Sequence, residues 1–220
     1  MNPDLGSVDA DGARRALRGG AAVVLPNPAP LTYVVAATDP RAVNAAKGRP
    51  LGQAVALWAH DPAVLAALDG VLDLAPGPAA LAHRLLTEER VTLLVPLRSD
   101  VQPPPWLAPA ALDGWTLLFG ARWTPLRPVL AEHPVLYVSS ANRTGHAPAA
   151  TAAEATAMFD ATVPVLGCAS LPGADRDPAE PPRSATTTLR LHPDGRLDLH
   201  RRGAQDRGHP NADRYLARLR

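Results

Sequence analysis

One segment of the chain reads Pro134-Val135-Leu136-Tyr137-Val138-Ser139-Ser140-Ala141-Asn142, an apolar run that ends in small polar residues. The apolar part predicts a buried strand. Polar residues just past the end of a buried strand are where open α/β sheets place ligand sites. Extended backbone would point Ser140 and Asn142 to the same side, and each side chain can donate or accept a hydrogen bond. The competing interpretation is a turn in which the serine and the asparagine cap their own backbone.

An earlier segment reads Ala46-Lys47-Gly48-Arg49-Pro50. A proline disfavours the helical conformation in the residue before it, so Arg49 should be extended. Lys47 and Arg49 would then aim at one spot, and two cations that converge beside a glycine suggest a bound anion. Arginine offers a bidentate contact to a carboxylate or phosphate, and lysine offers a compact point charge. The competing interpretation is a solvated loop end with two unrelated surface charges.

The whole chain alternates between strand and helix patterns, without an apparent internal repeat. Helices are expected at residues 12–18, 39–44, 62–68, 78–86, 125–131 and 151–159. Strands are expected at residues 21–25, 31–37, 53–58, 71–74, 90–96, 115–119, 135–138, 163–166, 185–191 and 196–200. The last two strands should form a hairpin. This order predicts a single α/β domain over residues 1–205, with a twisted mixed β-sheet flanked by helices.

Three other segments have a recognisable character. Residues 206–220 form a basic tail, in which a solvated terminal helix is expected and a basic arm for RNA is the alternative. The Gln102-Pro103-Pro104-Pro105 segment predicts a polyproline connector on the surface. Residues 172–182, rich in Pro, Asp and Glu, predict an exposed loop.

Composition argues against several classes of protein. The formal net charge of the 220 residues is +1, which gives no overall electrostatic case for nucleic-acid binding. The single cysteine, Cys168, excludes an intrachain disulfide framework and favours a reducing, cytoplasmic setting. The histidines are scattered singly, so no metal site is expected. No apolar run approaches membrane-spanning length, and the phosphate-loop, dinucleotide-binding, nucleophile-elbow and zinc-protease motifs do not occur.

Together the two polar segments resemble one family. Lys47-Gly48-Arg49 after a short helix, followed by Ser139-Ser140-Ala141-Asn142-Arg143-Thr144-Gly145 after a strand, is similar to the signature of the YrdC-like family of threonylcarbamoyl-adenylate synthases. The similarity extends to a leading strand that ends at Pro26, to the Arg183-Ser184-Ala185-Thr186-Thr187-Thr188 segment and to a closing strand at residues 199–204. The resemblance spans residues 8 to 204 and implies an α/β domain with a concave ligand-binding face.

The resemblance also implies a reaction. Enzymes of this family combine threonine, bicarbonate and ATP, which is accompanied by Mg²⁺, into threonylcarbamoyl-adenylate and release pyrophosphate. A tRNA-modifying transferase complex then passes the threonylcarbamoyl group to tRNA. Carried over by position, Lys47 and Arg49 are the catalytic cations. The remaining expected contacts are Ser140, Asn142, Ser184 and Arg122 to the nucleotide, and Asn27 and Trp58 to the amino acid.

Departures from the family pattern concentrate in the expected amino-acid pocket. Where the family has threonine hydroxyls after the leading proline, this chain reads Asn27-Pro28-Ala29-Pro30. The register also puts Gly120 where the family has an arginine, with Arg122 nearby, and Trp58 where the family often has a histidine. Three functions therefore stay open: a divergent synthase with threonine as the default substrate, a non-catalytic nucleotide- or double-stranded-RNA-binding module, and a carbamoyl-adenylate-forming variant in specialised metabolism.

Overall fold

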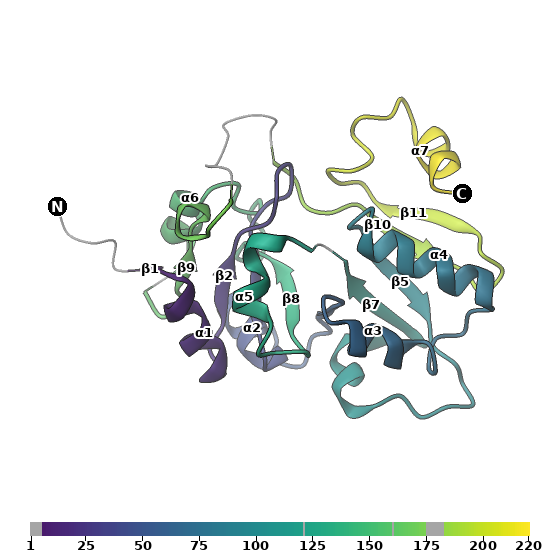
Figure 1. Ribbon diagram of the computed structural model, residues 1–220, viewed down its shortest axis with the longest axis horizontal. Helices are drawn as coiled ribbons and strands as arrows, with labels where there is room; N and C mark the ends of the chain where they lie inside the picture. The colour runs from purple at the N-terminus through teal and green to yellow at the C-terminus, as the bar shows by residue number, and fades with distance from the viewer. Residues whose placement is uncertain (1–5, 121, 160, 175–182) are drawn as a thin grey trace. The chain divides into compact units, whose positions relative to one another are not determined.

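The computed structural model describes residues 6–120, 122–159, 161–174 and 183–220 (Figure 1). The chain forms two compact units, each built from two separate stretches of sequence. Unit 1 comprises Met1–Val55 and Trp123–Ala185, and unit 2 comprises Ala56–Arg122 and Thr186–Arg220. Each unit contains parallel and antiparallel strand pairs with helices packed against them, which confirms the predicted α/β class with a mixed sheet.

The sheet of unit 1 is built around two fully buried strands. Its strand order is β1 (Ser7–Val8), β9 (Val165–Leu166), β2 (Val23–Leu25), β3 (Val34–Ala37) and β8 (Tyr137–Ser140). Strand β9 pairs in parallel with β1 and β2, whereas β3 pairs antiparallel with β2 and β8. Every residue of β2 and β3 is buried, as expected for apolar strands with neighbours on both sides.

Helices cover this sheet (Figure 1). Helix α1 (Ala10–Arg18) packs against β2 and β9, and the short α5 (Arg127–Leu130) packs against α1. Helix α2 (Pro40–Ala46) packs against β3 and β8, and α6 (Ala152–Met158) packs against β9. A 3₁₀ turn over Thr124–Leu126 leads into α5, and another lies at Cys168–Ser170.

The start of α2 is fixed by its sequence. Asp39 is the N-cap, and its carboxylate accepts a hydrogen bond of 2.8 Å from the backbone N–H of Arg41. Pro40 at the first helical position adds a preformed φ angle and lacks the N–H that would otherwise be left unpaired. Starting the helix there places Lys47 at its C-cap.

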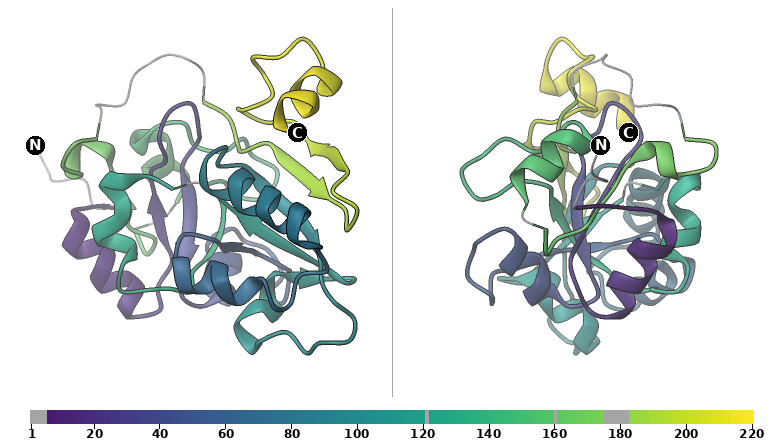
Figure 2. Two further views of the ribbon diagram at one scale, coloured as in Figure 1. Left: turned by 45° about the vertical axis from the view of Figure 1, so that its right-hand side comes forward. Right: turned by 90° about the vertical axis from the view of Figure 1, so that its left-hand side faces the viewer.

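Unit 2 has its own mixed sheet. Its strand order is β4 (Ala56–Trp58), β7 (Trp115–Phe119), β5 (Thr92–Pro96), β10 (Thr188–Leu191) and β11 (Leu197–Arg201), and β6 (Ala111–Leu112) also pairs with β7. Helix α4 (Pro76–Thr87) packs against β5, and the 3₁₀ helix Pro105–Ala110 packs against β4 and β7 (Figure 2). The remaining helices are α3 (Pro62–Leu68) and α7 (Ala212–Leu219).

Most of the expected elements occur, including the β10–β11 hairpin. The N-caps of α1, α2 and α6 are Asp9, Asp39 and Thr151. The strand expected at residues 71–74 is wrong, because Leu72 makes only an isolated bridge to Leu97. The short strands β1 and β6 were not expected. Much of the loop expected at residues 172–182 lies outside the described residues. Within the described ranges, no helix has both the length and the apolar character needed to cross a membrane.

Residues 206–220, expected to be a solvated tail, belong to unit 2. Helix α7 packs against β11 (Figure 2). Tyr215 and Leu219 on this helix are fully buried, so the solvated interpretation is wrong for its inner face. Asp206 is also buried, and its carboxylate accepts hydrogen bonds from the Gly203 N–H at 2.6 Å and the Thr187 hydroxyl at 2.8 Å. The segment is therefore fastened to the sheet of its unit.

Asp206 should make the stability of unit 2 depend on acid pH. Burial raises the pKa of its carboxyl, but hydrogen bonds from Gly203, Thr187 and Arg202 outweigh burial and leave the pKa below its ordinary value. A depressed folded-state pKa contributes stability that is present above about pH 4 and is lost as the pH falls through the folded value. We expect Asp206→Asn to lower the free energy of unfolding by about 2–3 kcal/mol at pH 7, and the difference from wild type to shrink below pH 4.

Urea unfolding at pH 7 and pH 3 checks this expectation. Arg202→Ala is the matched control, because the Arg202 side chain is 67% exposed and its ion pair with Asp206 should contribute less than about 1 kcal/mol. An equal loss for Asp206→Asn at both pH values would contradict the assignment.

Candidate functional site

Lys47 closes helix α2 and begins a tight reversal of the chain. Its backbone is in the right-handed helical region, with φ −86° and ψ −5°, and Gly48 follows in the left-handed region at φ +65°. A left-handed residue directly after a helix end is a position that glycine fills without strain. Lys47 and Gly48 are therefore not extended, because the helix cap determines the conformation at these two residues. The extended conformation expected of Arg49 stays a prediction.

The ammonium group of Lys47 is buried and has several oxygen acceptors. The residue is 4% exposed, and Nζ donates to the backbone oxygen of Asn142 at 2.7 Å and to Oδ1 of the same residue at 2.8 Å. It also donates to the backbone oxygen of Ser140. These three oxygens lie at the end of strand β8 and match the three N–H groups of an ammonium ion.

Asn142 joins this ammonium to the loop that follows. Its Oδ1 also accepts a hydrogen bond of 2.6 Å from the Ser140 hydroxyl. Its Nδ2 donates to the backbone oxygens of Arg143 at 3.1 Å and His146 at 2.8 Å. The structure thus brings Lys47, Ser140 and Asn142 together, as the spacing of the two segments suggested. We call these three residues the lysine network.

Arg49 has different partners from Lys47. Its Nε donates to Oδ1 of Asn44, while Nδ2 of Asn44 donates to the backbone oxygens of Leu51 at 2.9 Å and Gln53 at 2.8 Å. The Nη2 nitrogen of Arg49 is shielded from solvent and has no hydrogen-bond partner among the described residues. Burial lowers the pKa of this guanidinium from its ordinary value. The guanidinium of Arg49 therefore has one buried donor, at Nη2, whose hydrogen bond is unsatisfied within the described part of the chain.

Sequence reasoning missed Asn44. A signal existed, because asparagine is a poor residue for a helix interior, yet it stands in the middle of α2. The residue is fully buried, and its carboxamide is hydrogen-bonded on both sides. It fixes the loop from Lys47 to Gln53 and orients Arg49.

Asn27 and Ser184, expected to contact the amino acid and the nucleotide, come together elsewhere in unit 1. Asn27 is buried, and its Nδ2 donates to the backbone oxygen of Thr32 at 2.8 Å. Ser184 is held through its backbone, which donates to Pro30 and accepts from Thr32, both at 2.9 Å. Arg183 donates to the backbone oxygen of Asn27 at 3.0 Å. The carboxamide of Asn27 thus closes its own loop.

The other two expected contacts belong to unit 2. Trp58 is buried, and its ring makes an edge contact with Phe119 at 5.4 Å between centroids. Arg122 donates from Nε to the backbone oxygen of Ala59 at 3.2 Å, and burial lowers its pKa while Asp61 opposes this effect. A Cβ atom at Gly120 would lie 2.6 Å from the backbone oxygen of Leu86, so no side chain fits where the family has an arginine.

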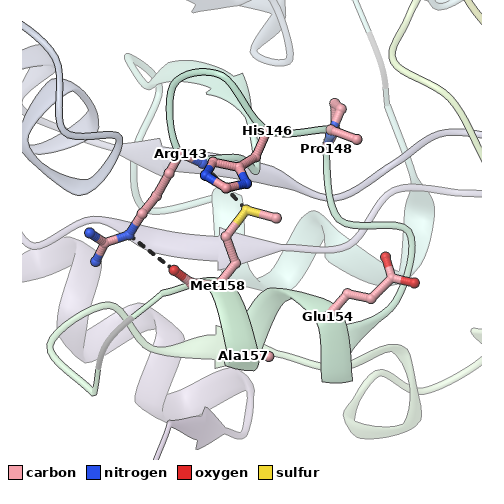
Figure 3. Close-up of a pocket in the computed structure, with 7 residues that line it drawn as sticks. Arg143, His146, Pro148, Glu154, Ala157 and Met158 are labelled. Carbon is pink, nitrogen blue, oxygen red and sulfur yellow. Dashed lines mark hydrogen bonds between the residues drawn. The ribbon is translucent and has the colours of Figure 1, made fainter.

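Unit 1 has a surface pocket of about 560 Å³ between the loop that follows Asn142 and helix α6 (Figure 3). It is lined by Arg143, His146, Pro148, Glu154, Ala157 and Met158, among others. Figure 3 shows the Arg143 guanidinium turned toward the backbone oxygen of Met158, to which its Nε donates at 3.0 Å. Asn142 holds one wall of this pocket through its bonds to Arg143 and His146.

Solved structures share this fold at low sequence identity. A variant of P. abyssi Sua5 is 16% identical with a TM-score of 0.64, over 90% of this chain and 58% of Sua5. E. coli YciO is 14% identical with a TM-score of 0.61, over 89% of each chain. Full-length HypF in a phosphate- and nucleotide-bound form is 16% identical with a TM-score of 0.62, over 91% of this chain and 30% of HypF.

These likenesses show that the chain has a YrdC-like fold, as the resemblance implied. The chain spans little more than half the length of the Sua5 structures that it matches. No protein-family model and no curated protein sequence matches it.

The hydrogen bonds of Asn142 predict how its loop responds to protease. In Asn142→Ala the backbone oxygens of Arg143 and His146 lose their donor, and Lys47 loses one acceptor. We expect trypsin to cleave after Arg143 several times faster in this variant, because the loop opens locally more often. Cleavage after Arg41, which is exposed on α2, should not change and serves as the internal control.

Mass spectrometry of timed digests gives both rates. An equal increase at Arg41 and Arg143 would indicate general destabilisation and would contradict a local role for Asn142.

Proposed function

From the YrdC-like fold and the cation site at the end of α2, we propose that this protein forms an aminoacyl-carbamoyl-adenylate from ATP, bicarbonate and an amino acid, with release of pyrophosphate. Threonine is the default amino acid, because one matched structure is P. abyssi Sua5 complexed with L-threonine. A tRNA-modifying transferase complex is the expected consumer of the product.

The buried donor at Arg49 Nη2, unsatisfied among the described residues, is the observation that carries the proposal. A buried guanidinium nitrogen without an acceptor is costly, and a bound anion would remove that cost. Carboxylate, bicarbonate and phosphate all present the oxygen pairs that arginine contacts well. Each of the three proposed substrates carries a negatively charged oxygen group, so each offers an acceptor that the Arg49 guanidinium could bind.

The proposed reaction places new charge on phosphate oxygens. The amino nitrogen first takes up the carbon of bicarbonate, with loss of water, to give a carbamate. A carbamate oxygen then bonds to the α-phosphorus, the bond from this phosphorus to the bridging oxygen breaks, and pyrophosphate leaves with the electron pair. Preorganised N–H donors stabilise such charge best where water is excluded. Arg49, oriented by Asn44, is suited to this role.

Magnesium is expected to come with ATP. Within the described part of the chain, no group of three or more His, Cys, Asp or Glu side chains is placed to hold a metal ion. The lysine network and Arg49 contribute no carboxylate. Mg²⁺ commonly binds phosphates and water with few protein ligands, so the triphosphate itself would hold the ion.

A carbamoyl-adenylate-forming activity is the second candidate, and Asn27 favours it. The Asn27 carboxamide donates to the Thr32 backbone inside its own loop, and the Pro28-Ala29-Pro30 segment adds no hydroxyl. A site without hydroxyl partners has no hydrogen bond that would select threonine over a smaller substrate, such as one that donates an unsubstituted carbamoyl group. The likeness to nucleotide-bound HypF is consistent with this candidate.

The RNA-binding alternative has less support from the described cations of unit 1. Lys47, Arg143 and Arg183 each donate to backbone oxygens of their own unit. Donors engaged in this way contribute less to the phosphate contacts that dominate nucleic-acid affinity.

Pyrophosphate release by the purified protein tests the proposal. With ATP, Mg²⁺ and bicarbonate, we expect threonine-dependent release, and Arg49→Gln should lower the rate by about tenfold or more, because a charge-assisted contact contributes about 1.5–3 kcal/mol. Arg41→Gln, an exposed arginine on α2, is the matched control and should retain the wild-type rate.

The outcomes separate the candidates. Pyrophosphate release from ATP and carbamoyl phosphate, without threonine, would favour carbamoyl-adenylate formation. No release with either substrate would reject both catalytic functions.

A further inference from the structure

Lys47 is the only lysine in a chain that contains 22 lysine and arginine residues in total. We infer that Lys47 does not contact the substrate anion but is a positioning residue for the end of strand β8, and that Arg49 is the cation that contacts the anion. This assignment rests on the proposed function, and it divides between two residues a role that the family resemblance implied for both.

The hydrogen bonds of Lys47 support the first half of this inference. Its Nζ donates to the backbone oxygens of Ser140 and Asn142 and to Asn142 Oδ1. These acceptors use all three N–H groups of an ammonium ion. An anion could bind Nζ only by displacing one of these oxygens, and that oxygen would then lose its charge-assisted hydrogen bond to the ammonium.

The residue type supports it as well. Every other member of the lysine and arginine set is an arginine. The one lysine stands where three oxygens converge on one nitrogen. A guanidinium spreads its donors over a planar fork and cannot direct three of them from a single atom. Lysine is therefore required here by geometry, whereas a surface charge or a phosphate contact would accept arginine.

Arg49 is in the opposite situation. Asn44 holds its Nε, while Nη2 is shielded and has no partner among the residues that the structure describes. Burial lowers the pKa of the guanidinium, and an anion would offset that desolvation. The three donors of Lys47 are thus all used within the protein, whereas Arg49 has one donor without an acceptor among the described residues.

Nitrogen-15 NMR of the wild-type protein, with inorganic pyrophosphate as the probe, tests whether Lys47 and Arg49 have these different roles. Because there is one lysine, a single side-chain ammonium resonance belongs to Lys47. We expect it to be visible without pyrophosphate, since its hydrogen bonds slow exchange with water, and to stay in place during the titration. The Nε–H resonance of Arg49, assigned by its loss in Arg49→Gln, should move.

Pyrophosphate affinity of variants gives a second readout. Arg49→Gln should bind pyrophosphate about tenfold more weakly or worse, and Arg41→Gln should bind like wild type. Lys47→Met and Asn142→Ala should each weaken binding, and the double variant should be little worse than either, because both act on one turn. Lys47→Arg should not restore the affinity lost in Lys47→Met.

Two NMR results would overturn the inference: a Lys47 resonance that moves as far as that of Arg49, or a Lys47 resonance that appears only with pyrophosphate. Three affinity results would also overturn it: restored affinity in Lys47→Arg, additive effects of Lys47→Met and Asn142→Ala, or no binding of pyrophosphate by the wild-type protein. None of these measurements needs turnover. If the protein binds pyrophosphate as described but releases none from ATP, the inference stands and the proposed function is rejected. If it releases pyrophosphate from ATP but Lys47 responds to added pyrophosphate as Arg49 does, the proposed function stands and the inference is rejected.

Discussion

The buried ammonium of Lys47 is the constraint on which the site in unit 1 depends. A charge that is 4% exposed is tolerated only when it is surrounded by acceptors, and here strand β8 and the turn after it supply three oxygens. The same contact ties the C-terminal end of α2, where a cation is favoured by the helix dipole, to a strand far along the chain. Two segments distant in sequence thereby become one rigid turn.

Asn142 and Asn44 then act as the second layer of this arrangement. Each uses its carboxamide oxygen to accept from a cation and its nitrogen to hold backbone oxygens of a loop. An amide can do both because it carries an acceptor and two donors without adding charge. The cations are thus fixed by neutral groups, so no carboxylate in these contacts neutralises the positive charge of Arg49.

Several elements of both units were predictable because their signals are local. The Asp39 cap, the apolar run into Ser140 and the hairpin turn near the C-terminus each depend on a few adjacent residues. The roles of Lys47 and Arg49 were not predictable in this way. The conformation at Lys47 follows from the helix end and the positive φ of Gly48, and its acceptors include backbone oxygens, whose directions no side-chain pattern reports.

The departures from the family pattern have a physical basis in each unit. In unit 2 a side chain at Gly120 would collide with the backbone of Leu86, so an arginine cannot be restored there without moving α4. In unit 1 the Asn27 side chain donates to the Thr32 backbone within its own loop. Under the function that we propose, the difference at Asn27 concerns the selection of the amino acid, whereas the lysine network and Arg49 concern the anion. Recognition of the anion and selection of the amino acid are therefore separate in the proposed function.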